Sequence, residues 1–321
     1  MSFREYLRVA TLAPDEGDEI EYLSIRSRVA CNALVNSQRD IPGTGCNYDP
    51  DVTALWQEYE RLKKEVSYPL PFNTLMMKVL VECLKQAPRL NAHFDYNHTS
   101  SSGRLIIKKH IDVSMPVCFE NGETFTVKIR ELEDKSLEEI ARQIELTKAR
   151  LENTNFKKVL FNVAGQRMFG YAVKGRLITT FAQFIAAYTG KGKIAKFSKL
   201  FRKKSYRHEG YKKDGPGSLR VEDFTEGTVC FTNWGTLYEG LKADITYIPP
   251  LYPQVFMFGT GRVKEVKDVF RNEKGELDLR MKKVLPVMMV FDHKIGGAAD
   301  LMPFIKKLDE ILEHPEIIRE W

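Results

Sequence analysis

The 321-residue chain contains few of the residues that mark disulfide scaffolds and metal sites. Its five cysteines (Cys31, Cys46, Cys83, Cys118 and Cys230) are widely scattered, and so are its six histidines. No short paired spacing of either residue type occurs. We therefore expect neither a disulfide framework nor a metal site.

Long hydrophobic runs are also absent. The longest uncharged apolar stretch extends from Leu177 to Gly190 and has 14 residues, which is shorter than the roughly 20 residues that span a bilayer. The N-terminus lacks the apolar core of a signal peptide and has its first charged residue at Arg4. Since 43% of the residues are apolar, we expect a globular protein with no integral membrane segment, located in the cytoplasm.

The net charge of +6 comes from one segment. Residues 191–213 carry ten Lys and Arg residues and one Glu, a local charge of +9 that leaves −3 for the rest of the chain. A nucleic-acid-binding protein would carry basic charge along a whole binding face, so we expect no nucleic-acid partner. This basic patch suits the phosphates of a cofactor, an acidic partner or anionic lipid, although it could equally be a solvated loop.

Hydrophobic periodicity predicts an α/β protein. Apolar stripes predict helices over Asp51–Val66, from Asn73 to before Pro88, and from Ser136, where Glu139 completes a capping box. Alternating or continuous apolar runs predict strands at 104–117, 228–232, 255–258, 261–270, 277–281 and 284–291, and Asn121-Gly122 predicts a hairpin turn. A last helix is predicted to bury Leu301, Ile305, Leu308 and Leu312.

The organisation that we predict is a single domain over residues 1–321 with a helical insertion at about 156–218. Two apolar helical patterns, around 159–168 and 177–188, precede the basic patch, and a Gly-Pro-Gly turn ends the segment.

His293 is the first candidate for chemistry. It follows the most apolar strand and precedes the pair Gly296-Gly297 and a helix start. Ligands of open α/β sheets bind at such strand ends. An imidazole there can be oriented by the backbone and shielded from water, and its pKa suits a general base. A hydrogen-bonded structural histidine is the alternative interpretation.

Thr232 is the second candidate, at the end of the strand TVCFT and before Asn233. A hydroxyl group at this position could donate a hydrogen bond to a developing oxyanion. On its own, Thr-Asn at a strand end also fits an ordinary turn.

Several motifs in order along the chain resemble the catalytic domains of the 2-oxo acid dehydrogenase acyltransferases, which are relatives of chloramphenicol acetyltransferase. Residues 291–300 (FDHKIGGAAD) resemble the motif Asp-His-Arg-x-x-Asp-Gly-Ala of that family. Residues 227–235 (GTVCFTNWG) are similar to its Gly-x-Phe-Thr-Ile-Ser-Asn-Leu-Gly strand, and 88–94 (PRLNAHF) to its Pro-x-Leu-Asn-Ala-x-Phe. The resemblance extends over about 23–155 and 219–321.

The resemblance implies a two-layer α/β fold of the chloramphenicol acetyltransferase type, with a mixed sheet and helices, that assembles as a homotrimer. It implies an acyltransferase that uses coenzyme A, or acyl-CoA, as a substrate in a channel between subunits. His293 matches the general base and Thr232 the oxyanion donor, with Asp292, Asn233 and Gly297 in supporting positions. Gly297 replaces the second Asp of the motif, and Lys294 replaces its Arg.

Three functions remain open. The leading one is an acyl-CoA-dependent acyltransferase with an unidentified acceptor, and the second is a non-catalytic trimeric scaffold, which Gly297 favours. The third is a transacylase using lipoyl domains supplied in trans, because we expect no lipoyl domain, and hence no lipoate, on this chain.

The insertion could take part in any of these functions. We expect the basic patch to contact CoA phosphates or to dock an acidic carrier protein. Its candidate side chains are Lys191, Lys193, Lys196, Lys199, Arg202, Lys203 and Lys204. Four aromatic residues could line an acceptor pocket, although packing in the core is the simpler interpretation: Phe169, Tyr171, Phe181 and Tyr188.

Overall fold

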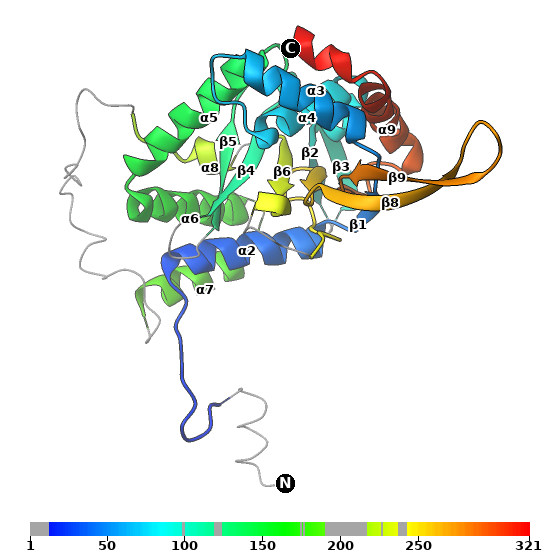
Figure 1. The fold of residues 1–321 in the computed structure, drawn as a ribbon. Coiled ribbons are helices and arrows are strands. Elements are labelled where there is room, and N and C mark those ends of the chain that lie inside the picture. Colours follow the sequence, from blue (N-terminus) through cyan, green and yellow to red (C-terminus); the bar gives the residue numbers. More distant parts are fainter. Residues whose placement is uncertain are drawn as a thin grey trace. The chain divides into compact units, whose positions relative to one another are not determined.

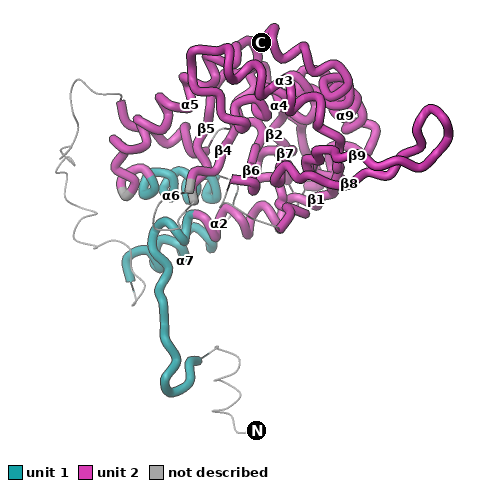
Figure 2. Tube along the Cα trace, viewed as in Figure 1, with its two compact units in different colours: residues 1–29, 160–207 teal, residues 30–159, 208–321 magenta. Residues whose placement is uncertain are grey.

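The computed structural model describes residues 13–97, 100–118, 124–173, 175, 177–189, 217–225, 227–236 and 243–321. The chain divides into two compact units, residues 1–29 with 160–207 and residues 30–159 with 208–321 (Figure 2). The predicted basic patch and the Asn121-Gly122 turn lie outside the described residues.

A six-stranded mixed sheet forms the centre of the larger unit (Figure 1). The neighbouring strands β4, β6 and β7 are parallel, and the remaining pairs of this sheet are antiparallel. In spatial order its strands are β1 (Gly43–Tyr48), β10 (Val287–Asp292), β7 (Phe256–Thr260), β6 (Val229–Asn233), β4 (Val113–Cys118) and β5 (Thr124–Ile129). Two hairpins accompany it, β2 (Ala92–Asn97) with β3 (Ser102–Ile107) and β8 (Lys264–Arg271) with β9 (Leu277–Val284).

Helices cover one face of this sheet, and their apolar stripes form the main core with it (Figure 1). The covering helices are α3 (Thr53–Glu65), α4 (Phe72–Gln86), α5 (Leu137–Glu152) and α9 (Ala298–Glu313). The remaining helical elements are α2 (Ile25–Asp40), α6 (Phe156–Val173), α7 (Leu177–Tyr188), α8 (Glu222–Thr225), η1 (Pro88–Leu90), η3 (Trp234–Thr236) and η4 (Pro315–Glu320).

The elements form where local signals predict them. The capping box of α5 is present, because the amide of Glu139 donates to Ser136 Oγ at 3.2 Å and the Glu139 carboxylate accepts from the Ser136 amide at 2.9 Å. All six residues of β10 are buried, as expected for a strand covered on both faces. The predicted layered α/β class with a mixed sheet is therefore confirmed.

Two local predictions need correction. The predicted strand 284–291 is interrupted after Val284, because Pro286 has no amide hydrogen to donate to a ladder, and β10 begins only at Val287. In α9 the fully buried positions include Phe304 and Ile311, whereas the predicted Ile305 and Leu312 are only partly buried against the core.

Candidate active site

His293 immediately follows β10, and the backbone holds it from two sides. Its amide donates to the carbonyl oxygen of Pro42 at 3.0 Å, and its Nδ1 lies 2.9 Å from the carbonyl oxygen of Gly296. Because a carbonyl oxygen can only accept, Nδ1 carries the proton and Nε2 keeps its lone pair. His293 is exposed in the single chain, so its shielding from water stays a prediction.

Asp292 and Lys294, on either side of His293, form an anchored ion pair. The buried Asp292 carboxylate accepts from the Lys294 amide at 3.0 Å and lies 3.3 Å from Lys294 Nζ. Burial raises the pKa of Asp292, and the bonds and charge of Lys294 oppose that rise. Lys294 Nζ also donates to the backbone oxygen of Asp40 and lies 5.1 Å from the ring centre of Phe94. The residues that flank His293 are thus fixed to two other elements.

A second ion pair holds the loop after His293. Arg89 donates to Asp300 at 2.8 Å and to the carbonyl oxygen of Ile295 at 2.5 Å. The Asp300 carboxylate also accepts from the amide of Gly297, at the start of α9. A Cβ at Gly296 would lie 1.9 Å from Asp300 Oδ2, so a larger residue at this position would displace the Asp300 carboxylate. The carbonyl group that orients His293 therefore belongs to a loop that Arg89 and Asp300 hold.

Thr232 lies on β6, on the sheet face that bears a smaller apolar cluster. Gly259 stands opposite it on β7, and a Cβ there would lie 3.4 Å from Thr232 Cγ2. The side chain is 7% exposed. Asn233 makes one distant and one local bond: its amide group donates to Asn73 Oδ1 in α4, and its oxygen accepts from the Gly235 amide at 2.7 Å. Asn233 thus fixes the turn after β6.

The two predicted catalytic groups are far apart within one chain. Thr232, Gly259 and Met288 form one row across β6, β7 and β10. His293 lies five residues beyond Met288, or about 16 Å along the strand, and two strand spacings of about 4.8 Å also separate it from Thr232. One chain therefore cannot apply both groups to the same reacting carbonyl.

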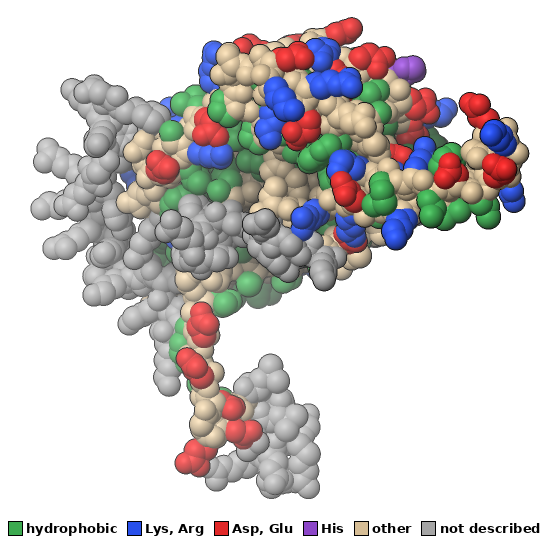
Figure 3. Space-filling view, viewed as in Figure 1, with side chains coloured by type: hydrophobic (Ala, Val, Ile, Leu, Met, Phe, Trp, Pro, Cys, Tyr) green, Lys and Arg blue, Asp and Glu red, His purple; other side chains and the backbone are tan. Residues whose placement is uncertain are grey.

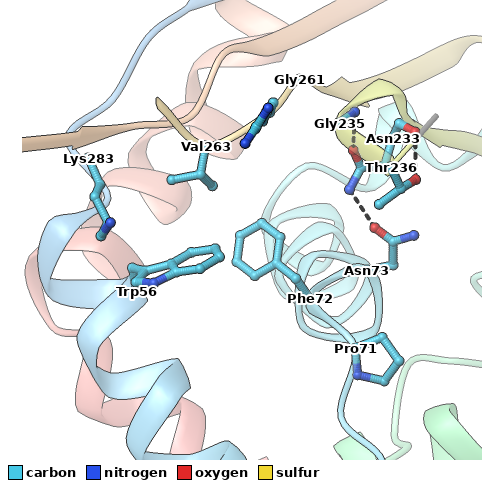
Figure 4. A pocket seen from close by; sticks show the side chains of 11 residues that line it. Trp56, Pro71, Phe72, Asn73, Asn233, Gly235, Thr236, Gly261, Val263 and Lys283 are labelled. Carbon is cyan, nitrogen blue, oxygen red and sulfur yellow. Dashed lines mark hydrogen bonds between the residues drawn. The ribbon is translucent and has the colours of Figure 1, made fainter. Parts of the chain in front are cut away.

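A pocket of about 350 Å³ lies at the end of β6 where Thr232 is found (Figure 4). Its aromatic wall consists of Trp56 and Phe72, whose ring centres are 5.1 Å apart, and Lys283 Nζ lies 5.7 Å from the Trp56 ring centre. The lining residues are Trp56, Pro71, Phe72, Asn73, Asn233, Gly235, Thr236, Gly261, Arg262, Val263 and Lys283. An aromatic wall with two cations can bind a group that combines an apolar or aromatic part with negative charge.

This pocket was not predicted from the sequence. The available signal was Trp56, which lies in the predicted helix 51–66 beside the buried Leu55 and is itself only partly buried. The core interpretation of two insertion aromatics is wrong, since Phe169 and Phe181 are exposed, whereas Tyr171 and Tyr188 are partly buried.

Features of two other kinds of site are not seen in the described residues. No helix there is both long and apolar enough to cross a bilayer. Nor do three or more His, Cys, Asp or Glu side chains in the described segments converge as metal ligands.

Comparison with known sequences identifies one family over most of the chain. The sequence model described as 2-oxoacid dehydrogenases acyltransferase (catalytic domain) matches residues 14–161 and 208–319. The dihydrolipoyllysine-residue acetyltransferase component of the pyruvate dehydrogenase complex of Acholeplasma laidlawii is 20% identical over 315 residues, 96% of this chain and 43% of that protein. The same component of Staphylococcus aureus (strain COL) is 26% identical over 137 residues, 42% of this chain and 31% of that protein. The chain thus spans less than half the length of these curated relatives.

Solved structures share the fold. The truncated catalytic core of the 2-oxoacid dehydrogenase multienzyme complex from Thermoplasma acidophilum is 17% identical with a TM-score of 0.59, covering 93% of this chain and 99% of that one. The dihydrolipoamide acetyltransferase of Azotobacter vinelandii is 16% identical with a TM-score of 0.59, covering 94% of both chains. The predicted acyltransferase-type α/β fold is therefore confirmed.

Proposed function

Because the chain belongs to the 2-oxoacid dehydrogenase acyltransferase (catalytic domain) family, we propose that it transfers an acyl group between a CoA thioester and an acceptor. His293 is the general base. The observation that carries this role is the hydrogen bond between Nδ1 and the Gly296 carbonyl oxygen, which leaves the lone pair of the neutral ring on Nε2 of an exposed residue.

In the proposed reaction, Nε2 of His293 takes the proton of the attacking thiol, hydroxyl or amine as that group bonds to the carbonyl carbon of the thioester. Thr232 donates its hydroxyl hydrogen to the oxyanion of the tetrahedral intermediate. The carbon–sulfur bond then breaks, and the imidazolium returns its proton to the departing thiolate. General-base assistance typically contributes about 10²–10⁴-fold and one oxyanion donor about 10²–10³-fold.

The separation of His293 and Thr232 supports a site shared between two copies of the chain. One copy supplies His293, and its neighbour supplies Thr232. A closed ring of three such contacts is a homotrimer with three identical sites, which is the assembly that the family resemblance implies. In such a ring the exposed His293 is covered by the neighbouring subunit.

The pocket at the end of β6 is the proposed entry for CoA. Arg262 is exposed at its rim and, among the described residues, shows no hydrogen bond or ion pair. CoA carries phosphates that such a cation attracts, and the rings of Trp56 and Phe72 offer its adenine an aromatic surface. The alternative contact with CoA phosphates, through the basic patch of residues 191–213, stays a prediction.

For the acceptor, the named relatives point to a dihydrolipoyl group, since they are dihydrolipoyllysine-residue acetyltransferases. Another protein would then supply the lipoyl domain, and an acidic carrier protein is the alternative partner. A non-catalytic scaffold is the second candidate function, favoured by Gly297. At this position a Cβ would meet no described atom within 4 Å, so the space into which the Asp side chain of the motif would extend is open in the single chain.

The deciding experiment compares the wild-type chain with the His293→Ala variant in CoA release from acetyl-CoA, with dihydrolipoamide as acceptor. We expect a loss of at least about 10²-fold in kcat with an unchanged assembly by light scattering. The matched control is His314→Ala, because His314 is exposed at the opposite end of α9 and should retain full activity. Equal rates for the wild type and His293→Ala would overturn the proposed role and favour the scaffold.

A further inference from the structure

Helix α7 presents large apolar side chains to solvent. Ile178 is 88% exposed, Phe181 66% and Leu177 65%, and Ile185 is also exposed. We term these four residues the α7 face. At helical spacing, all four side chains project from the helix within about 100° of one another around its axis. Exposed apolar patches of this kind mark interaction sites.

The side of α7 that faces away from solvent is the less apolar one. Its partly or fully buried positions are Thr180, Gln183, Phe184, Ala187 and Tyr188. Thr180 Oγ1 donates to the carbonyl oxygen of Met168 in α6 at 3.4 Å, and Arg28 donates to that of Ala186 at 3.1 Å. The helix is thus attached through its polar and aromatic side, and the α7 face is left uncovered within the described part of the unit.

This face lies outside the family match, which omits residues 162–207. The family model therefore assigns no role to it. Helix α6 ends with two further exposed apolar residues, Phe169 at 72% and Val173 at 71%.

Charge indicates the kind of partner. Between residues 160 and 207 the sequence has 11 Lys and Arg residues and no Asp or Glu. The whole smaller unit, residues 1–29 with 160–207, has a net charge of +9, although five carboxylates stand between Asp15 and Glu21. Helix α7 itself contains no charged residue. An uncharged apolar face within a strongly cationic unit suits an anionic surface that has an apolar interior.

We propose that the α7 face docks the protein on the surface of an anionic lipid membrane. Its 12 residues are too few to span a bilayer, so the helix lies parallel to the membrane plane with Leu177, Ile178 and Phe181 among the acyl chains. A second copy of the chain is a poorer occupant, because pairing two such units brings like charges together. This inference is independent of the catalytic residues.

The test uses the full chain and vesicle sedimentation. Vesicles of phosphatidylcholine alone are compared with vesicles in which about one lipid in three is phosphatidylglycerol. We expect the wild type to sediment with the anionic vesicles and to be released by high salt, and we expect the amides of α7 to exchange hydrogen more slowly when these vesicles are present. No binding to anionic vesicles would overturn the proposal.

The decisive variant is Leu177→Ser combined with Ile178→Ser, which should weaken vesicle binding at least about tenfold. Its matched control is Val269→Ser with Leu279→Ser on the β8–β9 hairpin. These residues are 61% and 66% exposed. They lie on a hairpin that carries charged side chains of both signs among its apolar ones (Figure 3). The control should bind as the wild type does.

Circular dichroism and acyl transfer in solution, both expected to be unchanged, show that the α7 variant is folded. If the α7 variant binds vesicles as tightly as the wild type, charge alone accounts for binding and the α7 face is not the docking site. If instead the wild type does not bind vesicles and the α7 variant has a different oligomeric state, the α7 face is an interface between copies of the chain. The membrane proposal is then overturned.

Discussion

At the scale of single residues, the ion pair that flanks His293 has a pH-dependent role. The side chain of Asp292 is 2% exposed, and Lys294 is its cationic partner at 3.3 Å. Burial raises the pKa of Asp292 above its unfolded value. A raised pKa means that the folded chain holds this proton more tightly, so the group contributes stability at low pH and loses it as the pH rises through the folded pKa. Lys294 therefore matters most near neutral pH, where Asp292 is charged.

We predict that Lys294→Met lowers the free energy of unfolding by about 3 kcal/mol near pH 7, because it leaves a buried carboxylate unpaired. The deficit should be smaller at a second, acidic pH, where Asp292 takes up a proton. Urea denaturation at the two pH values measures this difference. Lys294→Arg keeps the charge and serves as the control, and a deficit that is equal at both pH values would contradict the assignment.

At the scale of elements, the junction between β10 and α9 depends on η1, from which Arg89 reaches the loop. Arg89 bridges the Asp300 carboxylate and the Ile295 carbonyl oxygen, and Gly296 in the same loop accepts from the imidazole. Loss of the guanidinium group would loosen the loop and misorient the ring of His293, because a small misplacement of a catalytic group reduces the rate strongly.

For Arg89→Gln we predict a loss of roughly tenfold in kcat with little change in KM for CoA. Steady-state kinetics separates the two parameters, and NMR titration of the His293 ring reports its orientation without relying on activity. The control is Arg142→Gln, which removes an exposed ion pair with Glu138 on α5. An equal loss of activity in both variants would indicate a general effect of charge removal instead.

Helices and strands whose signals come from residues close together in the sequence could be predicted. The periodicity of α3 and α4, the Ser136 capping box and the buried run of β10 each need only a short window of residues. The contacts of Arg89 were not predictable, because Arg89 and Asp300 are 211 positions apart and no local pattern couples them. The exposure of Phe169 and Phe181 was missed for a similar reason. An apolar helix has the same sequence pattern whether its apolar face packs on the core or is exposed to solvent.

At the scale of the whole molecule, motif matching identified His293 and Thr232 but could not show how far apart they lie. That separation follows from β10 running antiparallel to β7 while β6 runs parallel to it. Such pairing is decided by contacts between segments distant in the chain. The pocket beside β6 likewise joins α3, α4, β9 and the turn after β7, which come together only in the fold. The insertion that we predict at about 156–218 stays a prediction. The family match omits residues 162–207, which lie within that range.

A shared site between subunits can be tested by mixing two inactive chains. In an assembly of one variant alone, either His293→Ala or Thr232→Ala, every site lacks one of the two groups. A mixed assembly can contain an intact site, because the Thr232→Ala chain still supplies His293 and the His293→Ala chain still supplies Thr232. After joint refolding at equal amounts, about one contact in four in a cyclic trimer has this pairing, so the mixture should recover about a quarter of the wild-type rate. Mixing the same chains without refolding is the control, since exchange is then prevented. Recovery requires that the two groups act across an interface; a mixture no more active than its components would show that catalysis does not combine His293 with the hydroxyl group of a neighbour.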